Sequence, residues 1–291
     1  MPLHSLMRGL AVLGVLGLLG APISASAASA PADETASVTL DHTRQWQMHN
    51  AAGDAYRIMI SLPDGPPPQA GYPVLYVLDG NAYFPAFHAA RETIERYRET
   101  IIVGIGYPEA QSLNWLRRSY DFSPPAPPEH NEPPQGGQDA FLSFIEHRLK
   151  PRVEAELPVD PQRQSLFGHS FGGMFAIYAL FQRPHLFAQV VAASPSLWWA
   201  SHHLLALEPD FADTMATGRF KNPPSLALIV AEGDTPQEIQ EARAMAKRLT
   251  PLSAFGFRAS YTRIPGVDHA TVPFKIVPRV LREVFDVGYT P

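Results

Sequence analysis

The chain has 291 residues, of which 45% are hydrophobic, a formal net charge of −5 at pH 7, and no cysteine. The hydrophobic share excludes a disordered chain. The negative charge, with no run of Lys or Arg, argues against nucleic acid and anionic membranes as partners. Without cysteine, disulfides, thiol chemistry and cysteine-bound zinc are excluded.

The first 27 residues have the pattern of a secretory signal peptide. One charged side chain, Arg8, precedes an apolar run over residues 9–19, which is shorter than the about 20 residues of a membrane-spanning helix. Small residues follow, and Ala25-Ser-Ala27 fits a cleavage site. We therefore predict a signal peptide over residues 1–27, a single domain over residues 28–291 and a periplasmic location, with secretion as an alternative.

Short apolar runs then alternate with segments of helical periodicity. The predicted strands are residues 56–62, 74–78, 101–105, 165–167, 189–193 and 226–231, and the predicted helices are residues 85–97, 139–149, 171–181, 236–249 and 271–285. The later strands are continuously apolar, as strands buried on both faces are. This alternation predicts an α/β fold with a mostly parallel central sheet and helices on both faces. A proline-rich loop over residues 123–137 has no periodicity, and loops of this length are often functional.

The segment around Ser170 is typical of a catalytic serine. Gly168-His-Ser170-Phe-Gly172 follows an apolar strand and opens an apolar helix, which is the context of a nucleophile elbow. The flanking glycines let strand and helix approach each other. The turn also places Ser170 at a helix N-terminus, where N–H groups favour a developing anion.

A catalytic serine needs a base and an acid that orients the base, and in this architecture the chain order is serine, acid, histidine. His269 lies in a turn before the last helix and is the predicted base. Asp234 is the preferred acid, at the end of the strand over residues 226–231, with Glu232 second. Asp268 is expected to be a turn residue. A Ser–His dyad without a close acid remains an alternative.

An oxyanion hole needs two backbone N–H groups. One is expected from Phe171, the residue after the nucleophile. The other is expected from Asn81, in the turn Asp79-Gly80-Asn81 that follows an earlier buried strand. We therefore predict that the N–H groups of Asn81 and Phe171 hold the oxyanion of an ester intermediate.

Together these segments resemble the esterase-D-like branch of the α/β-hydrolases, over about residues 40–287. The likeness rests on Leu78-Asp-Gly-Asn81, the elbow Gly168–Gly173, Ser194-Pro-Ser-Leu-Trp-Trp199 and Gly266-Val-Asp-His269. Within that branch the chain is most similar to exported trilactone siderophore esterases, the enterobactin and salmochelin hydrolases, because Arg118-Ser-Tyr-Asp121-Phe-Ser-Pro124 and the Trp198-Trp199 segment resemble theirs. The resemblance implies that Ser170 and His269 are catalytic and that Arg118 contacts the substrate.

The resemblance implies a periplasmic serine esterase that opens the ester bonds of a catecholate siderophore, iron-loaded or iron-free. Catechol rings would stack on Trp198, Trp199 or Tyr120 and pair with Arg117 or Arg118. We expect no metal and no organic cofactor, because no histidine pair has zinc-ligand spacing in a plausible helix, and we expect a monomer. One alternative is a feruloyl or acetyl esterase acting on small or polysaccharide esters. Another is a non-catalytic siderophore-binding protein with a hydrolase fold.

Overall fold

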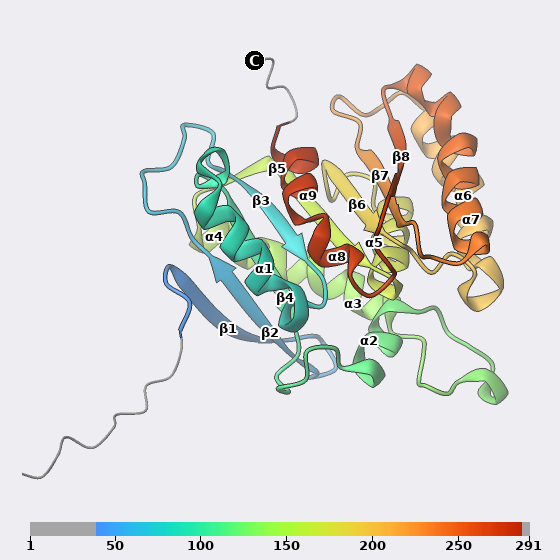
Figure 1. The fold of residues 1–291 in the computed structure, drawn as a ribbon, viewed down its shortest axis with the longest axis horizontal. Coiled ribbons are helices and arrows are strands. Elements are labelled where there is room, and N and C mark those ends of the chain that lie inside the picture. Colours follow the sequence, from blue (N-terminus) through green and yellow to red (C-terminus); the bar gives the residue numbers. More distant parts are fainter. Residues whose placement is uncertain (1–38, 287–291) are drawn as a thin grey trace, which may run out of the picture. The chain divides into compact units, whose positions relative to one another are not determined.

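The computed structural model describes residues 39–286, and the described residues from Leu40 onward form one compact unit (Figure 1). The predicted signal peptide, residues 1–27, lies outside the described residues. No helix in the described part of the chain is both long enough and apolar enough to span a membrane.

Eight strands form one twisted sheet in the order β1-β2-β4-β3-β5-β6-β7-β8. Strands β3 to β8 run parallel, whereas β1 and β2 pair antiparallel with each other and β2 pairs antiparallel with β4. The strands are β1 (Thr43–His49), β2 (Ala55–Ser61), β3 (Tyr72–Val77), β4 (Ile101–Gly106), β5 (Val159–His169), β6 (Gln189–Ala193), β7 (Ser225–Ala231) and β8 (Arg258–Ile264). The predicted mostly parallel α/β fold is confirmed.

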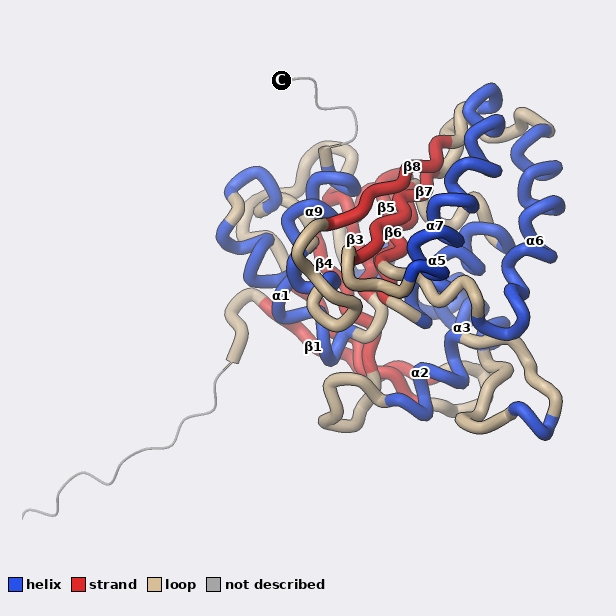
Figure 2. Tube along the Cα trace, turned by 45° about the vertical axis from the view of Figure 1, so that its right-hand side comes forward, coloured by secondary structure: helices blue, strands red, loops and turns tan. Residues whose placement is uncertain are grey.

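Helices cover both faces of the sheet, which lies between them in Figure 2. One face packs against α3 (Gln138–Phe144), α4 (Lys150–Glu156), α5 (Phe171–Gln182), α6 (Trp199–Ala216) and α7 (Pro236–Leu249). The other packs against α1 (Gly80–Thr93), α8 (Val272–Lys275) and α9 (Val277–Phe285). The remaining helices are α2 (Trp115–Phe122), the π-turn η3 (Ile145–Leu149) and three short 3₁₀ turns, η1 (Glu95–Tyr97), η2 (Pro128–His130) and η4 (Thr250–Phe255).

The differences from the predicted elements have local causes. Strands β1 and β8 lie at the two edges of the sheet and are half exposed, so they lack a continuous apolar run. Helix α2 is short and rich in charge, and α6 contains Pro209, so neither shows a clear apolar period. Helix α1 begins at Gly80 and contains Pro85, where the sequence predicts its start. The predicted helix over residues 139–149 continues through η3 and α4 to Glu156.

Candidate active site

The turn between β5 and α5 holds Ser170 in a strained conformation. Its φ and ψ angles are 59° and −118°, a combination that residues with a side chain rarely adopt. The Ser170 N–H donates to the carbonyl of Ala193 on β6 at 2.9 Å and fixes the turn. A Cβ atom on Gly168 would lie 2.1 Å from the carbonyl oxygen of Gly172, so only glycine lets the chain reverse here. The chain has the sharp strand-to-helix turn of a nucleophile elbow.

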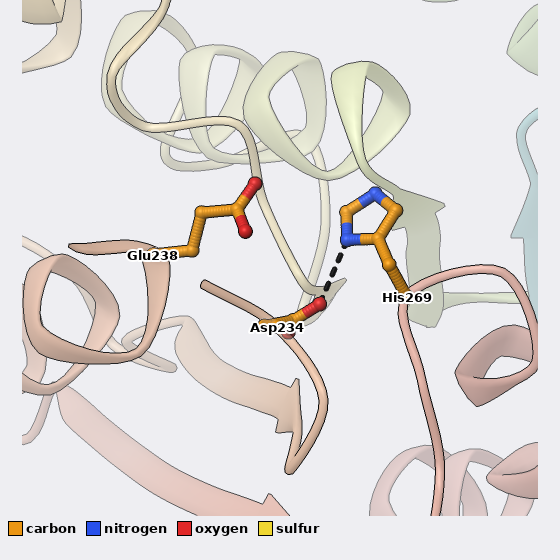
Figure 3. A group of neighbouring side chains, drawn as sticks. All are labelled: Asp234, Glu238 and His269. Atoms are coloured by element: carbon orange, nitrogen blue, oxygen red, sulfur yellow. Dashed lines mark hydrogen bonds and ion pairs between the residues drawn. The ribbon is translucent and has the colours of Figure 1, made fainter. Parts of the chain in front are cut away.

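The loop after β8 brings His269 to the same end of the parallel strands. Its Nδ1 lies 2.8 Å from Oδ1 of Asp234, which sits on the turn after β7 (Figure 3). The second ring nitrogen of His269 points away from Asp234. The ring centroid lies 4.8 Å from that of His169, the residue before Ser170. The geometry therefore gathers a serine, a histidine and an aspartate at one edge of the sheet.

Hydrogen bonds hold Asp234 as a carboxylate, although it is only 6% exposed. Its Oδ2 accepts from Ser194 Oγ at 2.5 Å and from the Ala231 N–H at 2.8 Å. Burial alone would raise the pKa of Asp234, but these bonds and the one from His269 outweigh burial and hold its pKa below the usual value. The hydrogen bond to Asp234 in turn raises the pKa of His269 above 6.5. An ionised Asp234 can orient the imidazole and stabilise the imidazolium.

Glu232, the second candidate for the acid, takes no part in this arrangement. Its side chain is exposed and accepts a hydrogen bond from the N–H of Gly266 at 3.0 Å. Asp268 accepts from the Thr271 N–H at 2.8 Å and shapes the turn, as expected of it. The carboxylate that contacts the histidine is therefore that of Asp234, which gives His269 the close acid that a triad requires.

Two further serines support the triad, and the sequence pattern assigned a role to neither. The hydroxyl of Ser196 lies 3.3 Å from that of Ser170, and its N–H donates to the Ser170 carbonyl at 3.2 Å. Ser194 donates to the acid, as described above. Both belong to the segment Ser194–Trp199 that carries part of the family resemblance. The sequence therefore marks this segment, but it does not show that these two hydroxyls lie next to Ser170 and Asp234.

His169 lies beneath the triad and contacts its histidine. Its Nδ1 is 2.9 Å from the hydroxyl of Tyr83. Burial is the main cause that lowers the pKa of His169 to about 3, so the ring is neutral at physiological pH. A neutral ring packed against His269 supports the position of that ring without adding a competing charge.

The two predicted oxyanion donors lie at the starts of α1 and α5. Asp79, just before α1, has a left-handed φ of 52°, and Asn81 is the second residue of the helix. Among the described residues, the N–H groups of Asn81 and Phe171 have no hydrogen-bond partner. The Asn81 side chain donates to the carbonyl of Tyr107 at 3.0 Å and accepts from its N–H at 3.1 Å, which anchors the turn. Two unpaired N–H groups at helix starts suit a developing oxyanion.

Arg118 lies inside the protein behind these helix starts, at 2% exposure. Its Nε and Nη2 donate to the two carboxylate oxygens of Asp79 at 3.0 Å each, and Nη2 also donates to the carbonyl of His169 at 3.3 Å. The pair joins the turn that carries Asn81 to the elbow that carries Ser170. The family resemblance predicts that Arg118 contacts the substrate, whereas the structure places its guanidinium on Asp79.

A row of aromatic rings borders the elbow. Successive ring centroids lie 5.4 Å apart for Trp115 and Phe171, 4.6 Å for Phe171 and Trp199, and 5.2 Å for Trp199 and Trp198. Trp115 and Trp198, at the two ends, are 52% and 38% exposed. The Trp199 Nε1 donates to Gln135 at 2.8 Å and ties the row to the proline-rich loop. The sequence predicted Trp198 and Trp199 as substrate-binding residues but missed Trp115, which lies in a polar segment without a motif.

Asp234, Glu238 and His269 offer possible metal-ligand atoms that all lie within 4.8 Å of one another (Figure 3). Asp234 and His269 hydrogen-bond directly to each other. The Glu238 carboxylate accepts from the N–H and the hydroxyl of Thr235, which caps α7. These hydrogen bonds engage Nδ1 of His269, Oδ1 of Asp234 and Oε2 of Glu238, so the cluster consists of the histidine–aspartate pair and the neighbouring helix cap.

A strained serine, a histidine–aspartate pair and two unpaired N–H groups on this sheet are the arrangement of the α/β-hydrolases that use a serine nucleophile. The comparison with protein families agrees: the model of the family "Putative esterase" matches residues 49–270. The chain belongs to this esterase family and is an ester hydrolase.

Similar proteins are siderophore esterases. The chain is 35% identical to the ferri-bacillibactin esterase BesA of Bacillus subtilis over 78% of this chain and 83% of BesA. The crystal structure of the BES protein from Bacillus cereus superposes with a TM-score of 0.80 at 33% identity, covering 86% of this chain and 97% of that one. The enterobactin and salmochelin hydrolase IroE superposes with a TM-score of 0.66 at 25% identity, covering 84% and 94%. The predicted family is confirmed.

Proposed function

We propose that this protein is a serine esterase that hydrolyses the ester bonds of a catecholate trilactone siderophore. The observation that carries the proposal is the hydrogen-bonded pair of Asp234 and His269 beside the strained Ser170 elbow, with the aromatic row next to it. The relatives named above, BesA as a ferri-bacillibactin esterase and IroE as an enterobactin and salmochelin hydrolase, support the substrate class. The predicted signal peptide supports action in the periplasm.

The geometry suits a two-step ester hydrolysis. Ser170 Oγ attacks the ester carbonyl while His269 takes its proton, and the resulting oxyanion is held by the N–H groups of Asn81 and Phe171. His269 then gives the proton to the leaving alcohol, and the ester bond breaks to leave an acyl group on Ser170. Water attacks that acyl group, gives a proton to His269 and releases the acid, after which the proton returns to Ser170. Asp234 keeps the imidazole oriented throughout.

The aromatic row suits a planar aryl group. Exposed faces of Trp115 and Trp198 can stack on catechol rings, and aromatic pairs of this kind contribute about 0.5–1.5 kcal/mol beyond the area that they bury. The same exposed rings also suit a second candidate, a feruloyl ester on a saccharide. The guanidinium of Arg118 lies 5.8 Å from the ring centroid of Trp115, but it is bonded to Asp79 and buried, so it offers no free charge to an anionic catechol.

One experiment separates these candidates. The purified mature protein is incubated with enterobactin and, separately, with a feruloylated sugar, and linear products are followed by mass spectrometry. We expect trilactone opening that is lost in Ser170→Ala. Release of ferulate alone would move the activity to saccharide esters. Failure of a serine-reactive phosphonate to label the wild-type protein would favour the non-catalytic siderophore-binding alternative.

A further inference from the structure

Glu238 places a second carboxylate beside the catalytic histidine. It is the third residue of α7, and its Oε2 accepts from the N–H and the hydroxyl of Thr235 at 3.0 and 2.8 Å. Its Oε1 accepts from the indole Nε1 of Trp198 at 3.3 Å. Figure 3 shows the carboxylate on the same side of Asp234 as the ring of His269. Three hydrogen bonds thus hold this charge between the aromatic row and the triad.

The negative charge of Glu238 has no positive partner. Among the described residues, Glu238 forms no ion pair, and its side chain is half-buried. The charged groups that act on the pKa of His269 are Asp234, Glu238 and Arg118. Of these, Arg118 is held in a bidentate pair by Asp79, and Asp234 is bonded to His269 itself. Beside His269, Glu238 is therefore a carboxylate that lacks an ion-pair partner among the described residues.

We infer that Glu238 is a specificity-determining residue that makes this site favour uncharged esters over esters that carry negative charge near the reacting carbonyl. A carboxylate fixed within 4.8 Å of the ligand atoms of Asp234 and His269 is close enough to repel an anionic acyl group. Two unit charges about 5 Å apart in a water-like medium change a rate constant by about fourfold, and more where water is excluded. Added salt weakens the effect.

If the substrate is a catecholate siderophore, as proposed above, the inference implies that the protein prefers the metal-free siderophore to the ferric complex. A free catechol is uncharged at neutral pH, because phenolic hydroxyls ionise near pH 10. Binding of one ferric ion by three catechols releases six protons and leaves a complex with three negative charges. A site with a fixed, unpaired carboxylate disfavours that trianion relative to the neutral trilactone.

The test uses two activated esters that differ only in charge, 4-nitrophenyl succinamate, which is neutral, and 4-nitrophenyl hemisuccinate, which is anionic. The quantity compared is the ratio of kcat/KM for the neutral ester over that for the anionic one, at low salt. We expect this ratio to fall about threefold to tenfold in Glu238→Gln. Glutamine retains the reach and can still cap the helix, so the variant changes the charge with little change in shape.

Two control variants isolate the charge. Glu232→Gln removes an exposed carboxylate that is paired with Arg263 at 3.6 Å, and we expect it to leave the ratio unchanged. Thr235→Ala weakens the helix cap but keeps the Glu238 charge, so it should also keep the ratio. An unchanged ratio in Glu238→Gln, or an equal fall in Thr235→Ala, would overturn the inference.

A second arm compares metal-free and ferric enterobactin in the wild-type protein and in Glu238→Gln. We expect the wild-type protein to open the metal-free form faster, and the variant to narrow the difference. If neither form is opened while the nitrophenyl ratio still falls, the siderophore proposal fails and the charge selection by Glu238 stands. If the ferric form is opened faster by the wild-type protein, the extension to the metal-free siderophore is overturned.

Discussion

Removal of the Arg118 guanidinium tests whether this residue contacts substrate or supports the site. In Arg118→Gln, the Asp79 carboxylate remains buried at 2% exposure without its cation. Breaking a buried ion pair on one side costs about 3–5 kcal/mol. A domain of this size loses about 2–4 °C in Tm for each kcal/mol, so we expect Tm to fall by about 6–20 °C.

The same change should lower kcat and leave KM nearly unaltered. The turn held by Asp79 carries the N–H of Asn81, and loss of one oxyanion donor lowers kcat by about 10²–10³-fold. An interaction made only in the transition state affects kcat rather than KM. The assay is 4-nitrophenyl butyrate hydrolysis beside thermal unfolding, both on the same preparation, below the lowered Tm.

Arg152→Gln is the matched control, because Arg152 forms an exposed ion pair with Glu156 at 2.7 Å, and such pairs contribute at most about 1 kcal/mol. Asp79→Asn combined with Arg118→Gln removes both buried charges and should recover part of the lost stability. The reasoning is refuted if Arg118→Gln keeps the wild-type Tm and kcat and raises only KM, which is the result that direct substrate contact predicts.

Three other outcomes are expected. The value of kcat/KM should rise with pH through a midpoint above 6.5, because His269 must be neutral to act as base. The pKa of His269 is raised chiefly by the hydrogen bond to Asp234. Asp234→Asn should therefore lower that midpoint and reduce kcat by about 10⁴-fold. Burial raises the pKa of Asp121 to about 7 in the folded state. The free energy of unfolding should therefore fall by up to about 4 kcal/mol as pH rises from about 4 to 7, because the folded protein holds this proton more tightly than the unfolded chain does. Urea unfolding of Asp121→Asn across that range should lack this decline. Gly168→Ala should prevent the elbow from forming, since its Cβ would lie 2.1 Å from a carbonyl oxygen, whereas Gly65→Ala meets no atom within 4 Å and should unfold in urea like the wild-type protein.

The candidate catalytic residues could be located from the sequence because their signals are local. The glycine spacing around Ser170 is a direct consequence of the turn that it must form, and His269 follows from chain order. The choice between Glu232 and Asp234 needed the structure, since both lie on the turn after β7 and only the path of the backbone decides which carboxylate turns inward. Propensity and periodicity do not contain that information.

The position of Arg118 could not be predicted, because its partner lies 39 residues earlier in the chain. Arginine in a segment that follows a parallel strand is compatible with both an exposed contact and a buried pair, and the distinction depends on how α2 packs. Trp115 could not be predicted for a related reason. Its neighbour Phe171 is distant in sequence, so the aromatic row forms only when the chain folds.

Reaction and recognition are built on different parts of this molecule. Ser170, Asp234 and His269 all stand on turns that follow the parallel strands β5, β7 and β8. The exposed rings of the aromatic row, Trp115 and Trp198, come from α2 and from the residue before α6, whereas Phe171 belongs to the elbow. The row is tied to the proline-rich loop through the indole of Trp199. Evolution, or a protein engineer, can therefore exchange the loop and the exposed rings to admit a different ester without disturbing the machinery that cleaves it. In this fold the residues proposed to cleave the ester and the exposed residues proposed to bind it can thus change independently.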